Sequence, residues 1–127
     1  MDKYYFENQR KNPTGKFTEM MIRTYFLIYK ACTENGTDNC FDSQVEDRKI
    51  CSKIYEGFYD DNPANLVIST VFECKKKLKK LKYISFFKDK VSDKWMIKIQ
   101  KELDFLTQEE RNDYFLKYEI TSEIKFE

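Results

Sequence analysis

The chain has 127 residues, of which 41% are hydrophobic and 17% aromatic, enough apolar side-chain area for one core without disulfides or metals. With only three glycines and two prolines, this composition excludes a disordered or low-complexity chain. The formal net charge is +1, yet residues 75–101 hold eleven lysines and two aspartates, a local charge of +9. This uneven distribution predicts a surface that attracts anionic partners.

The chain is predicted to be one domain, 1–127, because no internal repeat and no linker separates a second unit. Its first residues lack the apolar segment of a secretory signal, and its apolar stretches are too short to cross a bilayer. We therefore expect a cytoplasmic protein without membrane contact, whose four cysteines stay free thiols. Since the chain has no histidine and no Cys-x-x-Cys pair, no metal is expected, nor any other cofactor or small-molecule ligand.

Residues 1–16 are predicted to form an N-terminal arm, because Asn12-Pro13-Thr14-Gly15 is typical of a turn. The first helix is expected to begin with Thr18 as its N-cap and to stop at Asn35-Gly36. The apolar positions that recur with the helical period are Met21, Tyr25, Ile28 and Cys32. Further apolar residues between them predict a helix that is buried on most sides.

A loop is expected over 37–44, with a short extended piece at Cys40-Phe41-Asp42. A second helix is predicted over 45–59, where Ile50, Ile54 and Phe58 share one face. Asn62-Pro63 then favours the start of a third helix over 63–82, since asparagine caps helices and proline suits the first helical position. The positions of this helix that should face the core are Val67, Val71, Cys74, Leu78 and Leu81.

The period of the pattern changes to two at 83–88 and again at 94–101, which predicts two strands joined by the loop 89–93. In the second strand Trp95 alternates with Met96 and shares its face with Ile97 and Ile99, so Trp95 is expected in the core.

A last helix is predicted to begin at Thr107, which can form a capping box with Glu110. Beyond it, Ile120, Ile124 and Phe126 stand at even spacing, which favours an extended tail. Residues 102–127 are therefore expected to be a C-terminal helix and tail, and they carry a net charge of −5.

The order of helix, short extended piece, two helices and hairpin over 18–101 resembles the winged helix-turn-helix family of DNA-binding domains. The residues that carry the resemblance are Ser69-Thr70-Val71, then Leu78, Leu81 and Ile84, followed by the hairpin 85–101. The resemblance implies a mainly α fold with a small β hairpin (α+β), to which terminal elements are added. It also implies that a serine or threonine near the start of the third helix faces DNA and that the hairpin forms the wing.

On this reading, helix 63–82 enters the major groove, where its first turns present polar side chains to base edges. Lysines at the end of that helix and around the wing loop then contact phosphates. The expected DNA-binding residues are Asn65, Ser69, Thr70, Glu73, Lys76, Lys77, Lys79, Lys80, Lys82, Lys88, Lys90 and Lys94.

We therefore expect a small double-stranded DNA-binding protein, such as a transcriptional regulator or an accessory factor of a plasmid, phage or conjugation system. Double-stranded RNA fits less well, because its deep, narrow major groove does not admit a helix. The alternative is a phage-type or mobile-element protein that inhibits a partner protein through the acidic residues of 102–127. A monomer and a homodimer are both open.

An enzyme is not expected, because the chain lacks histidine, a phosphate-binding Gly-x-x-x-x-Gly-Lys loop and a Gly-x-Ser-x-Gly elbow.

Overall fold

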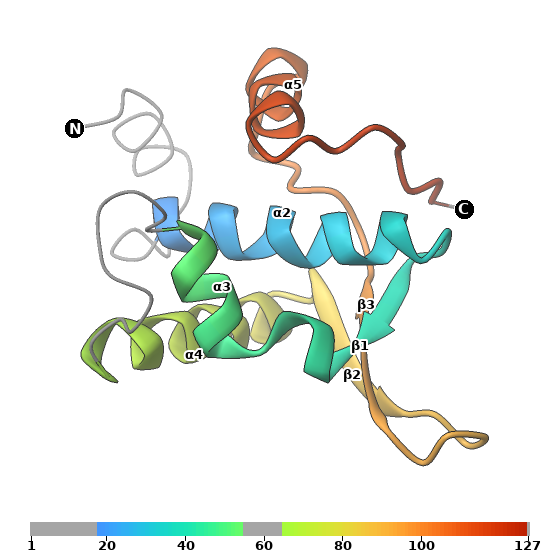
Figure 1. The fold of residues 1–127 in the computed structure, drawn as a ribbon. Coiled ribbons are helices and arrows are strands. Elements are labelled where there is room, and N and C mark those ends of the chain that lie inside the picture. The colour runs from blue at the N-terminus through green and yellow to red at the C-terminus, as the bar shows by residue number, and fades with distance from the viewer. Residues whose placement is uncertain (1–17, 55–64, 127) are drawn as a thin grey trace.

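The computed structural model describes residues 18–54 and 65–126, and for Thr18 and residues 65–67 it describes the backbone alone (Figure 1). The predicted arm, residues 1–16, and the end of the predicted second helix lie outside this part. The elements in chain order are α2 (Thr18–Glu34), β1 (Asn39–Phe41), the 3-10 helix η1 (Asp42–Val45), α3 (Asp47–Ile54), α4 (Asn65–Lys80), β2 (Ile84–Lys88), β3 (Trp95–Ile99) and α5 (Gln108–Lys117).

Helix α2 runs through the middle of the molecule, with α3 and α4 on one side and α5 on the other (Figure 1). From Met21 to Tyr29 every side chain except that of Arg23 is buried. The prediction that this helix is buried on most sides is therefore confirmed. None of the described helices is both long and apolar enough to cross a lipid bilayer.

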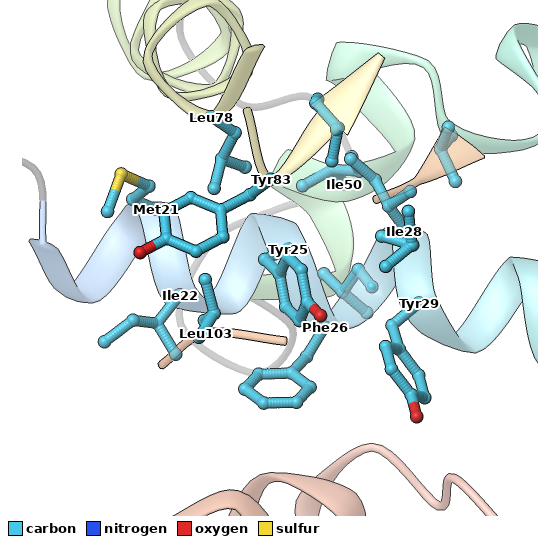
Figure 2. Packing of buried hydrophobic residues seen from close by; sticks show 14 of the residues in the cluster. Met21, Ile22, Tyr25, Phe26, Ile28, Tyr29, Ile50, Leu78, Tyr83 and Leu103 are labelled. Carbon is cyan, nitrogen blue, oxygen red and sulfur yellow. The ribbon is translucent and has the colours of Figure 1, made fainter. Parts of the chain in front are cut away.

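One side of α2 packs against α3, α4 and the residue before β2, from which Ile50, Leu78 and Tyr83 approach it (Figure 2). The opposite side carries Phe26 and Tyr29, which point toward α5 (Figure 2). All these side chains belong to one buried cluster, which also contains the four cysteines as free thiols. The expected free state of the cysteines is therefore confirmed.

The segment after β3 is attached to α2 by aromatic contacts and by hydrogen bonds of tyrosine hydroxyls. The ring of Phe26 stacks on Tyr114 at 5.1 Å between centroids. The Tyr25 hydroxyl donates to the carbonyl oxygen of Lys101 (2.9 Å), and the Tyr29 hydroxyl accepts from the backbone N–H of Ile124 (2.7 Å). The C-terminal residues thus cover the side of α2 that the other helices leave open.

The sheet has three antiparallel strands in the order β1-β3-β2, whereas the sequence pattern predicted a two-stranded hairpin with only an extended piece near Cys40. The third strand forms because Cys40 pairs with Ile97 on one edge of β3 while Phe86 pairs with the same residue on the other. β3 is therefore the central strand, and the two hairpin strands are shorter than the predicted 83–88 and 94–101.

Helix α2 ends at the predicted glycine. Gly36 has a φ of +74°, its N–H donates to the Thr33 carbonyl (2.9 Å), and the Thr37 N–H donates to the Cys32 carbonyl (3.1 Å). This pair of bonds is the Schellman motif, which satisfies the last carbonyls of a helix and needs a left-handed residue. Glycine adopts that conformation without a steric penalty.

Helix α4 ends in the same way but with a lysine in the left-handed position. Lys82 has a φ of +68°, its N–H donates to the Lys79 carbonyl (3.0 Å), and the Tyr83 N–H donates to the Leu78 carbonyl (2.9 Å). The predicted helix over 63–82 is therefore too long at its C-terminal end. The helix stops at Lys80 because the buried contact between Leu78 and Tyr83 favours the motif despite the missing glycine.

One further boundary differs from the prediction, and one agrees. The second helix begins at Asp47 instead of 45, because the Gln44 side chain accepts from the Phe41 N–H (2.9 Å) and holds η1 as a separate turn. The described part of the tail after α5 joins no strand of the sheet, and its Ile120 and Ile124 belong to the core cluster. The capping box is confirmed, since the Thr107 hydroxyl accepts from the Glu110 N–H (3.1 Å) and a Glu110 carboxylate oxygen accepts from the Thr107 N–H (2.9 Å).

Substitution Lys82→Gly is expected to raise the free energy of unfolding by about 0.5–1 kcal/mol, because glycine adopts the left-handed conformation without the steric cost that lysine pays. The matched control is Lys80→Gly, which removes the same charge from a helical position and should lower stability by up to about 1 kcal/mol. Urea unfolding of the two variants measures both effects. An equal loss of unfolding free energy in both variants would contradict the assignment of Lys82 to the left-handed position that ends α4.

Candidate nucleic-acid interface

Helix α4 presents one polar face to solvent, opposite the face that packs on α2. Its inner positions include Val71, Cys74 and Leu78, all fully buried. Because successive helical residues are about 100° apart, the line opposite these positions carries Ser69, Glu73, Lys76 and Lys80. All four side chains on this line are exposed. The outer face of α4 is therefore polar at its start and basic at its end, as the sequence pattern predicted.

The structure brings most of the predicted DNA-binding residues to the surface. Those that are exposed are Ser69, Glu73, Lys76, Lys79, Lys80, Lys82, Lys88, Lys90 and Lys94. Thr70 and Lys77 are half-buried on one flank of α4. Asn65 opens the described part of α4, but its side chain lies outside the described residues.

The exposed lysines fall into two groups, one along α4 and one around the loop of the β2–β3 hairpin, which extends beyond the helices (Figure 1). The hairpin loop is ordered by Asp89, whose carboxylate accepts from the N–H and the hydroxyl of Ser92, both at 2.8 Å. The bond from the Ser92 N–H is the main reason that the pKa of Asp89 lies below its usual value. Lys88 pairs with Asp93 across this loop at 3.3 Å, so part of the basic charge there is neutralised.

Lys75 differs from every other lysine of the basic segment that the structure describes, because the residue is only 6% exposed. Its ammonium donates to the carbonyl of Val45 at 2.6 Å and pairs with Asp47 at 2.8 Å. It therefore ties α4 to the start of α3 and takes no part in the basic surface. The helical period indicates this inward position for Lys75. The run of three lysines from Lys75 to Lys77, by contrast, indicates a face exposed to solvent.

Trp95 is 56% exposed, which corrects the expectation that it lies in the core. The strand register does place Trp95 on the same face of the sheet as Ile97, because their partners Lys88 and Phe86 are two residues apart on β2. The hairpin extends past the helices that cover this face (Figure 1), so Trp95, near the loop end of β3, is only partly covered. Met96, on the other face, is buried.

Beside the exposed Trp95 lies a groove of about 680 Å³ between α4, the sheet and the segment that joins η1 to α3. Its apolar lining comes from Phe72 on α4, which is 49% exposed, and from Phe86 and Trp95 on the sheet. The Lys76 ammonium lies 5.4 Å from the centre of the Phe72 ring, and that of Lys79 lies 5.7 Å from the Phe86 ring. We call this feature the aromatic groove; sequence reasoning missed it because its three rings come from separate elements.

The side of α2 opposite α4 carries mainly acidic charge. The exposed carboxylates of the C-terminal segment are those of Glu102, Asp104, Glu109, Asp113, Glu119 and Glu123. Since α5 and α4 lie on opposite sides of α2 (Figure 1), the exposed lysines of α4 and the exposed carboxylates of the C-terminal segment lie on opposite sides of that helix. Such a charge dipole orients the molecule toward a polyanion.

Within residues 18–54 and 65–126, no three cysteine or carboxylate side chains gather as a metal site would require. No protein-family model, no curated protein and no solved structure matches the chain.

Substitution Lys75→Met should lower the free energy of unfolding by about 2–4 kcal/mol, because it leaves Asp47 and the Val45 carbonyl without their buried partner. The neighbouring substitution Lys76→Met is the control and should change stability by less than about 0.5 kcal/mol, since Lys76 is exposed. Chemical unfolding separates the two. Similar small losses in both would show that Lys75 belongs to the surface after all.

Proposed function

We propose that the protein binds double-stranded DNA as a winged helix-turn-helix domain, with α4 as the recognition helix and the β2–β3 hairpin as the wing. The single observation that carries this proposal is the gathering of exposed lysines along α4 and around the hairpin loop, whereas the acidic C-terminal segment lies on the other side of α2. The order of elements, α2-β1-α3-α4-β2-β3, supports it, because it follows the order that the sequence resemblance implies.

The dimensions of α4 suit a major groove. At 1.5 Å per residue its 16 described residues span roughly 24 Å, and a B-DNA major groove about 12 Å wide admits one helix. Ser69 and Glu73 lie on the outer line of the helix, where hydroxyl and carboxylate groups could bond base edges. Lys76, Lys80 and Lys82 follow toward its end, where phosphates would lie.

The hairpin supplies the second set of phosphate contacts. Lys90 and Lys94 are exposed at its loop, and Lys88 becomes available once a phosphate replaces Asp93 as its partner. Phosphate contacts position a protein on DNA without reading its sequence, so specificity would come from the first exposed turns of α4. The biological setting that fits such a small domain is regulation of transcription or a role in a plasmid, phage or conjugation system.

Binding should weaken steeply as salt rises, because lysines displace counterions from the phosphates. If six to eight of the exposed lysines contact phosphate, log affinity should fall with log salt at a slope of roughly −5 to −7. Gel-shift titrations over a salt series measure this slope. Lys80→Ala should reduce its magnitude by about 0.9, whereas Lys117→Ala, on α5, should leave it unchanged. Binding that does not respond to salt would overturn the proposal.

Substitutions at Glu73 and Lys80 should act in opposite ways on random-sequence DNA. Glu73→Ala removes a negative charge and should strengthen binding to random duplexes. If the carboxylate bonds a base, the substitution should also reduce the difference in binding free energy between the selected target and random duplexes by about 1–3 kcal/mol. Lys80→Ala should weaken binding to both alike. The target is first obtained by selection from random duplexes; an unchanged preference in Glu73→Ala would remove this residue from the reading surface.

A second candidate function is inhibition of a partner protein through the acidic side. It is favoured by the six exposed carboxylates of the C-terminal segment, of which Asp104 pairs with Lys101 and Glu102 with Arg111. This function would be favoured if a stoichiometric protein partner were recovered, if charge reversal at Glu109 and Asp113 abolished that recovery, and if no DNA gave a gel shift.

Competition between duplex DNA and duplex RNA for the protein tests which of the two nucleic acids it prefers.

A further inference from the structure

The aromatic groove exposes more apolar surface than the fold requires. Phe72 and Trp95 come from α4 and β3 and are 49% and 56% exposed, while Phe86 of β2 lies between these elements in the lining of the same groove. Phe86 packs against the core cluster, whereas Phe72 and Trp95 belong neither to that cluster nor to the residues packed against it. Exposed aromatic side chains that gather around a hollow usually mark a binding surface.

The charges around the groove are arranged in two sets. Lys76 and Lys79 stand on the α4 side, close to the rings of Phe72 and Phe86. Asp42 and Glu46 stand on the side of η1 and the start of α3. Asp47 also lines the groove, but its carboxylate is occupied by Lys75. Within the described residues no hydrogen bond or ion pair engages the carboxylates of Asp42 and Glu46, which are therefore available as acceptors.

This combination matches the parts of a nucleotide. Aromatic rings stack on a base, which is worth about 1–3 kcal/mol per base. Lysines suit the adjoining phosphate, and carboxylates accept hydrogen bonds from the exocyclic amino group of cytosine or adenine. A duplex with all its bases paired cannot place a base in the groove, since its bases remain stacked on one another.

We infer that the aromatic groove accepts one unpaired base of the bound DNA, held between Phe72 and Trp95, and that it prefers bases with an exocyclic amino group. This inference rests on the proposed DNA binding and adds a ligand class to it. DNA with an unpaired cytosine, adenine or guanine next to a duplex is then the preferred ligand, and the outer line of α4 holds the duplex beside it.

Trp95 is the only tryptophan of the chain, so its fluorescence reports directly on the groove. The experiment titrates the full chain with three DNAs that are otherwise identical: a perfect duplex, one with a single unpaired cytosine and one with a single unpaired thymine. We expect the unpaired cytosine to quench Trp95 strongly and to bind roughly tenfold more tightly than the perfect duplex. Thymine, which lacks an exocyclic amino group, should fall between them.

Substitution Phe72→Ala should abolish the preference for the unpaired base while leaving binding to the perfect duplex unchanged. The matched control is Phe87→Ala, because Phe87 is also exposed but pairs with Met96 on the other face of the sheet. Glu46→Ala should lower the affinity for the DNA with the unpaired cytosine to that for the DNA with the unpaired thymine. Thermal unfolding of each variant checks that it remains folded, as expected for exposed side chains.

Equal affinities for the three DNAs, with salt-dependent binding retained and Phe72→Ala without effect, would overturn the inference and leave the proposed function standing. No binding to any DNA would overturn both. If a protein partner instead changed the fluorescence of Trp95, if Phe72→Ala abolished that change and if no DNA reproduced it, the groove would be assigned to a protein.

Discussion

The fold depends on the burial of α2 on both of its sides. A helix that is apolar around most of its circumference cannot remain at a surface, because each exposed apolar side chain loses roughly 1.5–3 kcal/mol of burial free energy. One layer, formed by α3, α4 and the sheet, covers only one side. The C-terminal segment is therefore a structural requirement, and its tyrosine and phenylalanine contacts with α2 show how it is met.

This two-sided cover determines which surfaces remain available. Helix α4 uses its inner face for α2, so its outer face is left to solvent and to partners. The carboxylates gather on the other side because α5 and the tail lie there (Figure 1). A formal charge of only +1 thus conceals a strong separation of basic and acidic surfaces, and the proposed binding to a polyanion rests on this separation.

The basic segment shows how far a charge pattern can be interpreted without coordinates. Neighbouring lysines have different roles: Lys75 is buried against Asp47, whereas Lys76 is exposed above the ring of Phe72. Helical period separates the two positions, but only the packing shows that the inward lysine finds a carboxylate and a carbonyl. A buried ammonium without such partners would be too costly to retain.

The aromatic groove shows the complementary case. Alternation correctly predicted that Trp95 shares a face with Ile97, but it could not show where the covering helices end. Burial is a property of what lies above a residue, and that neighbour comes from a distant part of the chain. The rings of Phe72, Phe86 and Trp95 meet only because α4 and the hairpin are brought together around the core.

The sequence by itself determined the local elements: the helical period of α2, the turn at Gly36, the capping box at Thr107 and the concentration of lysine after Cys74. These features depend on residues within about one or two helical turns, where propensity and hydrogen bonding act directly. Only the tertiary structure decided that β1 joins the hairpin, that Lys75 is internal, that Lys82 ends α4 and that Trp95 stays exposed. Each of these outcomes depends on packing between elements, which local periodicity does not encode.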